Sequence, residues 1–534
     1  MFYPEKRDGY SRRGRLRIDD VELITPALIE FNVDSGIPEI AKKIDFGRAP
    51  YPLKFISEDL FKRLGPSNKE VTVLTGLWHL SPKHLVQAFQ GIPKTNPIYA
   101  AASATPWNLA LLVYLGADIV DNILAVAMAY NGTYFLGDLE IPVSKLKKFP
   151  CSCRYCKNQV LENMDESDVN RTVAGHNTEL LRIEIEKCRR LIDNEEMRNY
   201  VEARVKLNPE MTASLRIADA TGEKASFARF KKSRCLFSAV ESVNRFEVSY
   251  FLNRAVRCYK PVTDTVLLLP CTARKPYLTS KTHRALRSKV KINVNEIIIS
   301  SPLVVPREFE LTYPAINYDT PVTGHWTEEE ISFVAFWLKK FIERGKFRKV
   351  VAHVEGGYRR VVEKAVRDLD TEIVFTAENG ILNEKSVKRL KEEIDGYSRF
   401  DLYHQIFDHM LRYQFEIEAE KHSYRGRYPE IEMLDGKERV ARVDTKYGML
   451  DIYEKLARLL LESGKYTVEI GDFDLTSTVF AAGVVNADER IRPNDIVVFH
   501  NSSIFGVGIA FMDGREMTES KRGIAIKVKR KFSL

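Results

Sequence analysis

Apolar runs and amphipathic segments alternate through the middle of the chain. Short, continuous apolar runs, typical of strands buried on both faces, lie at 265–270, 295–300, 348–354 and 372–376. Amphipathic segments predict helices over 327–344, with Thr327 as the N-cap, and over 357–368. Because alternation of strand and helix is typical of a parallel sheet between helices, residues 236–395 predict a doubly wound α/β core.

Different patterns flank this core. Residues 1–235 mix short strands with helices, and their strongly apolar helical run at 107–132 must be buried. Residues 396–462 carry a helix pair with polar, aromatic-rich connections, which we interpret as a small α+β linker domain. Over the last segment, short strands separated by turn signals such as RPND and MDGRE predict a small β-barrel. The sequence therefore predicts an α/β multidomain protein with domains at 1–235, 236–395, 396–462 and 463–534.

Composition and charge narrow the class of protein. The chain has 534 residues, and its 81 Lys and Arg exceed its 73 Asp and Glu by eight. That charge permits a polyanionic partner. No stretch reaches the roughly 18 apolar residues of a membrane span, and the N-terminus does not read as a signal peptide. We expect a cytoplasmic protein that does not contact a membrane.

Three of the seven cysteines form a cluster. Cys151, Cys153 and Cys156 lie within six residues, and His176 follows at the expected start of an amphipathic helix. Three thiolates and one imidazole complete a closed tetrahedral zinc site, which leaves no position for a reactive water. We therefore predict structural Zn²⁺. Three free cysteines in a turn are the alternative.

Several stretches of the first segment resemble tRNA-guanine transglycosylases. The four cluster residues, in this order and followed by HN and a helix, are similar to that family's zinc site. Residues 7–28 resemble its opening strands, and residues 104–135 resemble the segment with its aspartate nucleophile, onto which Asp121 falls. The family's barrel is longer, and of its Asp-Ser-Gly-Gly-Phe-Gln base-binding motif only a fragment occurs, at 34–36. The resemblance implies a shortened TIM-barrel-like domain in which Asp121 has a structural or binding role.

The C-terminal stretch 480–512, followed by GIAIKVKRKF, resembles a PUA domain, an RNA-binding β-barrel. Lys and Arg side chains concentrate in this stretch, and contacts from such side chains to phosphates give affinity for RNA that does not depend on sequence. We predict RNA binding, with Lys527, Lys529 and Arg530 as candidate contacts. A charged face that is merely solvated is the alternative.

Residues 265–286, TVLLLPCTARKPYLTSKTHRAL, read as strand, loop and helix. Ligands of open α/β sheets bind beyond the carboxyl ends of the strands, where Cys271 lies. A thiolate is a nucleophile, and Arg274, Lys275 and His283 are candidate neighbouring cations that favour the deprotonated form. Ser280 can cap the following helix and leave backbone N–H groups free for a developing negative charge. The alternative is a buried cysteine that packs under a turn.

The same stretch resembles a family signature. PCTARKPYLTSKTH matches, without a gap, the Pro-Cys-x3-Lys-Pro-Tyr-x2-Ser-x2-His pattern of archaeosine synthases, which are relatives of the transglycosylases. The resemblance implies a tRNA-modifying transferase that adds an amine to the nitrile of 7-cyano-7-deazaguanine at position 15 of the D-loop. It implies lysine as the favoured donor, with glutamine as the alternative, and a radical S-adenosylmethionine enzyme as partner. We leave a homodimer open.

These residues suggest a reaction. We expect Cys271 to attack the nitrile and form a thioimidate, which the amine then displaces. His283 is the expected general acid, and Lys275 and Ser280 would position substrate or stabilise charge. Irregular loops often carry function, and the irregular stretch 306–326 adds candidates. The further candidates are Asp319 for catalysis, and Tyr277, Tyr318, His325 and Asp121 for substrate binding.

Three alternatives stay open. In the first, no covalent step occurs and Cys271 is structural. In the second, the protein is an active base-exchange enzyme that depends on Asp121. In the third, it is a non-catalytic RNA-binding scaffold for a partner enzyme.

Overall fold

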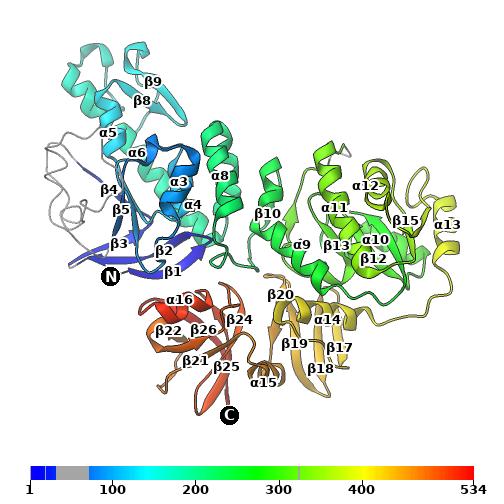
Figure 1. Cartoon of the computed structure of the whole chain (residues 1–534). Coiled ribbons are helices and arrows are strands. Elements are labelled where there is room, and N and C mark those ends of the chain that lie inside the picture. Colours follow the sequence, from blue (N-terminus) through cyan, green and yellow to red (C-terminus); the bar gives the residue numbers. More distant parts are fainter. Residues whose placement is uncertain (1, 19, 32–70, 323–324) are drawn as a thin grey trace. The chain divides into compact units, whose positions relative to one another are not determined.

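The computed structural model describes residues 2–18, 20–31, 71–322 and 325–534 (Figure 1). The predicted motif fragment at 34–36 lies outside these residues. The described chain divides into two compact units. The first comprises Met1–Ala228, Glu469–Pro493 and Ile509–Val528, and the second comprises Arg229–Val468, Asn494–Gly508 and Lys529–Leu534.

The first unit opens with an antiparallel meander, ordered β1-β2-β3, and continues into a parallel sheet ordered β4-β7-β6-β5. Residues of both sheets, including Leu16, Ile29 and Tyr99, share one hydrophobic cluster. Its strands are β1 (Phe2–Asp8), β2 (Ser11–Ile18), β3 (Val21–Thr25), β4 (Ala27–Ile29), β5 (Thr72–Leu74), β6 (Ile98–Ala100), β7 (Ile119–Asp121), β8 (Thr133–Leu136) and β9 (Leu139–Pro142). Its helices are α3 (Pro82–Phe89), α4 (Leu109–Leu115), α5 (Ile123–Tyr130), α6 (Glu166–Asn194), α7 (Met197–Arg204) and α8 (Pro209–Thr221).

The apolar run 107–132 is largely buried, as predicted, but it is not one helical run. Gly116 ends α4 at φ 122°, a conformation that favours glycine, and β7 then precedes α5. A continuous apolar run does not distinguish a buried strand from a buried helix, which explains the difference. Likewise His176 lies well inside α6, because that helix already begins at Glu166 after the N-cap Asp165.

The second unit contains the predicted doubly wound core. Its sheet is ordered β13-β12-β11-β15-β16, with β12, β11, β15 and β16 parallel and β13 antiparallel. The strands are β11 (Thr265–Pro270), β12 (Asn295–Ile299), β13 (Val304–Pro306), β15 (Lys349–Ala352) and β16 (Glu372–Phe375). The helices are α9 (Phe246–Cys258), α10 (Lys281–Lys289), α11 (Glu328–Gly345), α12 (Gly356–Val366) and α13 (Glu384–Ile394).

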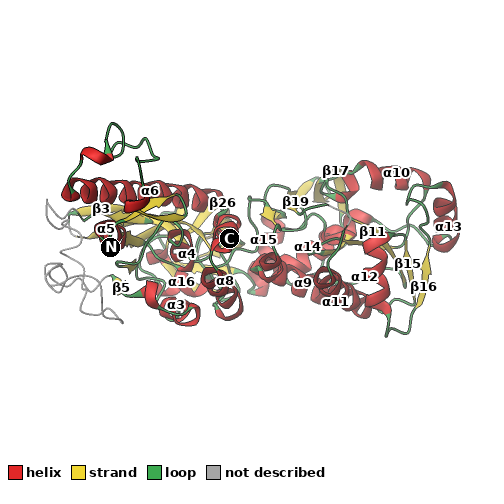
Figure 2. Cartoon of the chain, turned by 90° about the horizontal axis from the view of Figure 1, so that it is seen from above, coloured by secondary structure: helices red, strands yellow, loops and turns green. Residues whose placement is uncertain are grey.

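Helices cover both faces of this sheet. On one face, α10 and α13 pack against β11 and β15 in a cluster that contains Leu267, Leu286, Val351 and Leu390. Figure 2 shows α11 and α12 on the opposite side of the strands from α10. The four predicted strands and two predicted helices are confirmed, with ends within about two residues of those expected. Thr327 caps α11 in a capping box with Glu330.

The linker region combines α14 (Leu402–Phe415) and α15 (Glu454–Ser463) with an antiparallel sheet ordered β17-β18-β19-β20. Its strands are β17 (Ser423–Arg427), β18 (Glu430–Asp435), β19 (Glu438–Asp444) and β20 (Met449–Ile452). The C-terminal sheet is ordered β22-β26-β25-β24-β21-β23. Its elements are β21 (Thr467–Ile470), β22 (Thr478–Phe480), β23 (Val484–Ala487), β24 (Ile496–His500), β25 (Ile504–Ala510), α16 (Gly514–Glu519) and β26 (Ile524–Ser533).

Within the described ranges, no helix combines the length and the apolar character needed to cross a bilayer. The predicted turn at MDGRE is in fact the start of α16, because Asp513 accepts a hydrogen bond from Glu516 N and caps that helix.

Candidate active site and metal cluster

The strand order of the core defines where a ligand can bind. Chain order runs outward from β11 to β12 and β13 on one side, and to β15 and β16 on the other. The carboxyl ends of β11 and β15 therefore flank a topological switch point, the usual site for ligands in such sheets. Cys271 follows β11 directly, and the glycine turn of EGGY follows β15.

Cys271 and Tyr358 meet at this switch point. The Cys271 Sγ atom lies 3.2 Å from the Tyr358 hydroxyl, and both side chains are half-buried. The Cys271 amide donates to the Ile299 carbonyl over 3.0 Å, which extends the β11–β12 ladder and fixes the backbone that carries the thiol. The sulfur is thus held by regular structure at the rim of the sheet.

The β15–α12 turn is shaped to place Tyr358. Gly356 adopts φ 57°, which favours glycine. A Cβ on Gly357 would meet the Trp326 ring, so the turn needs a second glycine. Trp326 also packs its ring edge-to-face on Tyr358, with centroids 5.1 Å apart. These contacts restrict the tyrosine at the start of α12.

Lys275 lies beside the thiol on an aromatic surface. Its Nζ atom is 4.0 Å from the centroid of the Tyr318 ring, a cation–π contact. Burial lowers the pKa of the Lys275 ammonium, and the neighbouring Cys271 and Asp319 oppose that effect. The Tyr277 hydroxyl contacts that of Tyr318, which donates to Ser300 Oγ over 2.6 Å. Tyr277, Tyr318 and Ser300 are all buried. Their hydroxyl groups form a chain of contacts beneath Lys275.

Ser280 and His283 are both buried and both serve the geometry of α10. Ser280 Oγ accepts from the His283 amide at 3.2 Å and so caps the helix, as predicted. His283 Nδ1 accepts from Arg307 Nη2 at 2.9 Å, which leaves Nε2 to donate to the Pro270 carbonyl at 3.0 Å. Burial and the Arg307 charge lower the pKa of His283 to about 3. This geometry is at odds with a general acid, because the ring is neutral and both nitrogens are occupied.

The irregular stretch 306–326 follows β13, and its candidate side chains have different surroundings. Glu310 turns inward, where its carboxylate accepts from Arg307 at 2.5 Å and from the Tyr428 hydroxyl. Asp319 is about half exposed and pairs with Arg234 at 3.3 Å. His325 is exposed and precedes Trp326, the residue packed on Tyr358.

Tyr358, Ser300 and Arg307 were not singled out as site residues from the sequence. Tyr358 lies 87 positions from Cys271, so no local spacing joins them. A signal existed in the two glycines that follow a predicted strand, because ligand-binding turns in α/β sheets occur at that place. Arg307 could not be separated from any surface arginine by its sequence context.

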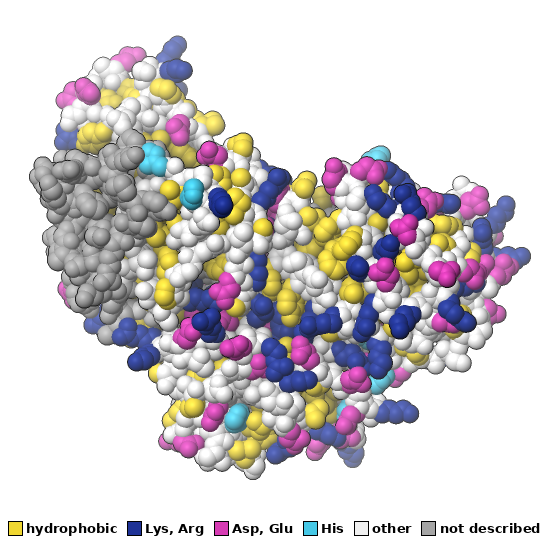
Figure 3. All heavy atoms as spheres, viewed as in Figure 1, with side chains coloured by type: hydrophobic (Ala, Val, Ile, Leu, Met, Phe, Trp, Pro, Cys, Tyr) yellow, Lys and Arg dark blue, Asp and Glu magenta, His cyan; other side chains and the backbone are white. Residues whose placement is uncertain are grey.

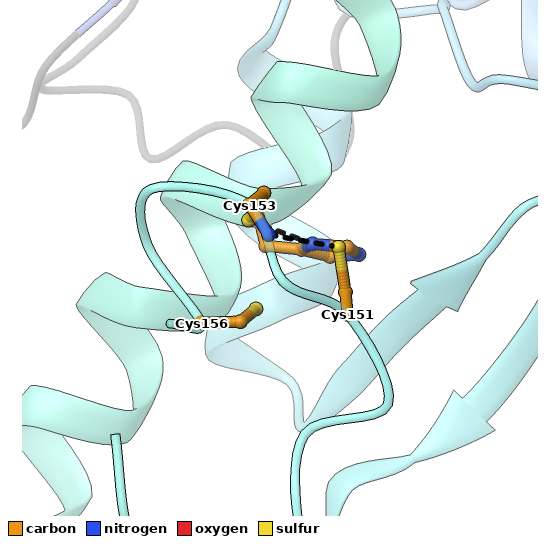
Figure 4. Close-up of side chains that lie close together, drawn as sticks. Cys151, Cys153 and Cys156 are labelled. Atoms are coloured by element: carbon orange, nitrogen blue, oxygen red, sulfur yellow. Dashed lines mark hydrogen bonds between the residues drawn. The ribbon is translucent and has the colours of Figure 1, made fainter. Parts of the chain in front are cut away.

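The predicted metal ligands come together in the first unit. The ligand atoms of Cys151, Cys153, Cys156 and His176 all lie within 4.8 Å of one another, and Figure 4 shows the three cysteines gathered beside α6. His176 Nε2 donates to the Phe135 carbonyl at 2.7 Å, so Nδ1 is the acceptor nitrogen; it lies 3.5 Å from Cys153 Sγ and 3.4 Å from the Tyr134 hydroxyl. A carbonyl that fixes the tautomer is typical of metal-bound histidine. The donor set therefore fits a metal ion.

Asp121 is fully buried at the carboxyl end of β7. Its Oδ2 atom accepts from the Tyr99 hydroxyl at 2.5 Å and from Ala102 N at 2.9 Å, and its Oδ1 atom accepts from Ile123 N at 2.9 Å. Burial raises its pKa to about 6 despite these donors. Both oxygens are committed to the protein, an arrangement that supports a structural role for this carboxylate.

The candidate RNA contacts on β26 differ from one another. Lys527 is exposed. Lys529 and Arg530 instead surround the buried carboxylate of Asp451, with three contacts of 2.8 Å. Their ion pairs lower the pKa of Asp451 to about 2, although burial opposes this. Both side chains form ion pairs with Asp451 of the linker region, contrary to the expectation that both contact RNA. Elsewhere on the viewed face, Lys and Arg are interspersed with Asp and Glu (Figure 3).

Comparison with known proteins identifies the segments. Family models match for queuine tRNA-ribosyltransferase at 81–210, a domain of unknown function (DUF5591) at 248–394, a pre-PUA domain at 400–461 and a PUA domain at 475–532. Cys271 and Tyr358 thus both fall in the segment whose model carries no assigned function. A crystal structure of a protein of unknown function is 64% identical, with a TM-score of 0.50, and the match covers 53% of this chain and 100% of that one.

Two relatives match most of the chain. The archaeosine synthase subunit alpha of Methanosarcina acetivorans is 35% identical over 475 residues, which cover 83% of this chain and 76% of the relative. The archaeosine synthase of Haloferax volcanii is 33% identical over 467 residues, which cover 84% and 78%. Because both relatives are more than 30% identical and match more than two thirds of either chain, the chain belongs to the archaeosine synthase family.

Proposed function

We propose that this protein is a tRNA-modifying transferase of archaeosine biosynthesis, which joins an amine to the nitrile of 7-cyano-7-deazaguanine at position 15 of the D-loop. The observation that carries the proposal is the Cys271 thiol at the switch point of the core, in contact with Tyr358 and beside Lys275. A nitrile is an electrophile that a thiolate attacks without prior activation, so this site suits the substrate class that the relatives' name implies.

Cys271 acts as the nucleophile in this proposal. Its sulfur forms a bond to the nitrile carbon, one C–N π bond becomes an N–H bond, and a thioimidate results. The amine then adds to the same carbon and the thiol leaves, which gives the amidine. Splitting the reaction in this way replaces one difficult step by two easier ones.

Lys275 stabilises charge around the sulfur. Its ammonium lies on the Tyr318 ring and interacts electrostatically with Cys271. A cation there stabilises the negative charge that sulfur carries as it attacks and as it leaves. Ser280 and His283 hold α10 and the end of β11 in place and so act as positioning residues, not as acid and base.

Lysine is the donor that we favour, with cleavage of the lysine adduct left to a radical S-adenosylmethionine partner. Zn²⁺ is the metal that we propose for the cysteine–histidine cluster, where it would hold the loop of Cys151–Cys156 against α6. Because all four donors are protein side chains, the metal supplies structure there. A cytoplasmic location is part of the same proposal.

The test uses tRNA that carries the 7-cyano base, incubated with the purified protein and either lysine or glutamine, followed by mass spectrometry of the nucleosides. We expect a nucleoside heavier by one lysine. Direct formation of the amidine with glutamine would replace lysine as donor. An unchanged nitrile with both donors, despite tight tRNA binding, would favour the scaffold alternative.

The role of Cys271 is tested separately with Cys271→Ser. We expect loss of turnover with unchanged tRNA affinity, because a serine hydroxyl is a far weaker nucleophile at neutral pH. Cys258→Ser is the matched control, since Cys258 is a half-buried cysteine of the same unit outside the site. Retained turnover in Cys271→Ser would overturn the covalent mechanism.

A further inference from the structure

The proposed covalent step needs a proton donor. When sulfur adds to the nitrile carbon, the nitrile nitrogen gains negative charge and must be protonated for the thioimidate to form. Without a donor in the site, this proton has to come from water, and a positioned acid typically accelerates such a step by about 10²–10⁴-fold. The identity of that donor is therefore a question about mechanism that the signature residues leave unanswered.

With Lys275 assigned to the charge on sulfur, the other candidate groups at this edge of the core are poorly suited to donate. His283 is neutral, and its one N–H is already given to the Pro270 carbonyl. The Tyr318 hydroxyl donates to Ser300, and the Tyr277 hydroxyl contacts Tyr318. Asp319 pairs with Arg234 and is about half exposed to solvent.

Tyr358 has the position that these residues lack. It lies in the first turn of α12, which follows β15, the strand that pairs with β11 in parallel, and its hydroxyl contacts Cys271 Sγ at 3.2 Å. The nitrile nitrogen is one bond beyond the carbon that sulfur attacks. A hydroxyl that already contacts the sulfur is therefore within reach of that nitrogen once the substrate is bound.

Tyr358 also has the required protonation state and rigidity. Burial, together with the adjacent Cys271, raises the pKa of its phenol, so it carries its proton at neutral pH. Trp326 packs against its ring, and α12 begins with Gly356 at a positive φ and Gly357 against the Trp326 ring. A pre-placed donor needs little reorganisation at the moment of reaction.

We infer that Tyr358 is a catalytic residue of this site, which transfers its phenolic proton to the nitrile nitrogen as Cys271 attacks. This inference rests on the proposed covalent function. The balance is complete within the site: the S–C bond forms, one C–N π bond becomes an N–H bond with the phenol's proton, and the thiol's proton restores the phenol. The products are the thioimidate and a neutral tyrosine, and no oxidant or reductant takes part.

The test measures covalent capture of tRNA in Tyr358→Phe. Protein and tRNA with the 7-cyano base are mixed without an amine donor, and the cross-linked complex is followed on a denaturing gel. We expect capture to slow by about 10²-fold or more relative to the wild type, within the range for loss of a general acid. Tyr424→Phe, which removes another half-buried hydroxyl of the same unit, is the control and should capture tRNA at the wild-type rate.

A second readout separates proton delivery from a merely structural effect. Alkylation of Cys271 by iodoacetamide uses the same thiol but needs no proton donor. We therefore expect Tyr358→Phe to be alkylated within about threefold of the wild-type rate, and small acids such as imidazolium to restore part of its capture rate at fixed pH. Equal losses in capture and alkylation, or no loss in either, would overturn the inference.

A third variant covers the case in which Tyr358→Phe does not fold. Replacement of Tyr358 by 3-fluorotyrosine keeps the hydroxyl but makes it more acidic, so the pH above which capture declines should fall; an unchanged profile would overturn the role. Failure of the proposed function looks different. In that case the wild type captures no tRNA and Cys271→Ser retains turnover, whatever Tyr358 does.

Discussion

Arg307 donates a hydrogen bond to Nδ1 of His283 over 2.9 Å, and this contact fixes the protonation of the imidazole. The proton must then reside on Nε2, which donates to the carbonyl of Pro270, the residue before the candidate nucleophile. Arg307 is itself buried and pairs with Glu296 and Glu310. The network joins α10 to the end of β11 and keeps a histidine uncharged beside an arginine.

The first prediction concerns the pH dependence of stability. The pKa of His283 is lowered from the ordinary value of 6.5 to about 3, so between these values the unfolded chain binds a proton that the folded chain does not. The contribution of His283 to the free energy of unfolding is fully present above about pH 6.5 and is lost as the pH falls towards 3. At pH 5 the loss should be about 2 kcal/mol.

His283→Gln tests this dependence, because glutamine can keep both hydrogen bonds but does not titrate. Urea unfolding at pH 7.5 and pH 5 should show the wild type losing about 2 kcal/mol more than the variant. Equal losses in both proteins would mean that His283 is protonated in the fold. The variant should also retain most of its turnover, whereas loss of turnover at full stability would restore His283 as an acid.

The second prediction concerns the metal cluster. Cys156→Ser should reduce bound zinc from about one ion per chain to a small fraction and lower the melting temperature, because a closed site contributes folding free energy directly. Elemental analysis and calorimetry measure the two effects. Cys258→Ser, which changes a cysteine outside the cluster, should keep both zinc and stability; zinc loss there as well would contradict the assignment of ligands.

Sequence reasoning was most successful where structure is local. Strands such as 265–270 and 295–299 are buried on both faces and appear as continuous apolar runs, so their ends were close to correct. The same reasoning was wrong at 107–132, because the run contains a strand of only three residues between two helices. Apolar content alone predicted burial there but not the type of element.

The candidate site shows the same limit. Cys271, Lys275, Ser280 and His283 are neighbours in sequence and could be identified together. Tyr358 joins them only because β15 pairs with β11, and that order of strands is not encoded in any local pattern. The buried partner of His283, Arg307, likewise comes from a separate segment, so the sequence did not indicate the contact that bears on the proposed role of this histidine.

The third prediction concerns Asp121. Replacement by Asn should destabilise the protein by about 1–3 kcal/mol. The amide N–H of asparagine would face one of the three donor groups from which the carboxylate now accepts hydrogen bonds. We expect amine transfer to tRNA to stay within about twofold, below the effect of removing a catalytic group. Chemical unfolding and nucleoside analysis measure the two quantities. Incorporation of free labelled base by the wild type, abolished in Asp121→Asn, would instead establish base exchange.

The last prediction separates two kinds of positive charge on β26. Lys527 is exposed, whereas Arg530 is held by Asp451 and stacks on Tyr453 at 4.0 Å. Lys527→Ala should weaken tRNA binding and reduce the slope of log affinity against log salt by about one, with stability unchanged. Arg530→Ala should leave that slope unchanged and lower stability by about 1–3 kcal/mol, because it removes hydrogen bonds from a buried carboxylate.

Fluorescence anisotropy over a salt series measures the slope for each variant, and thermal unfolding in parallel measures its stability. A reduced salt slope in Arg530→Ala would show that the arginine leaves Asp451 to contact RNA, because only a charge that neutralises phosphate contributes to the slope.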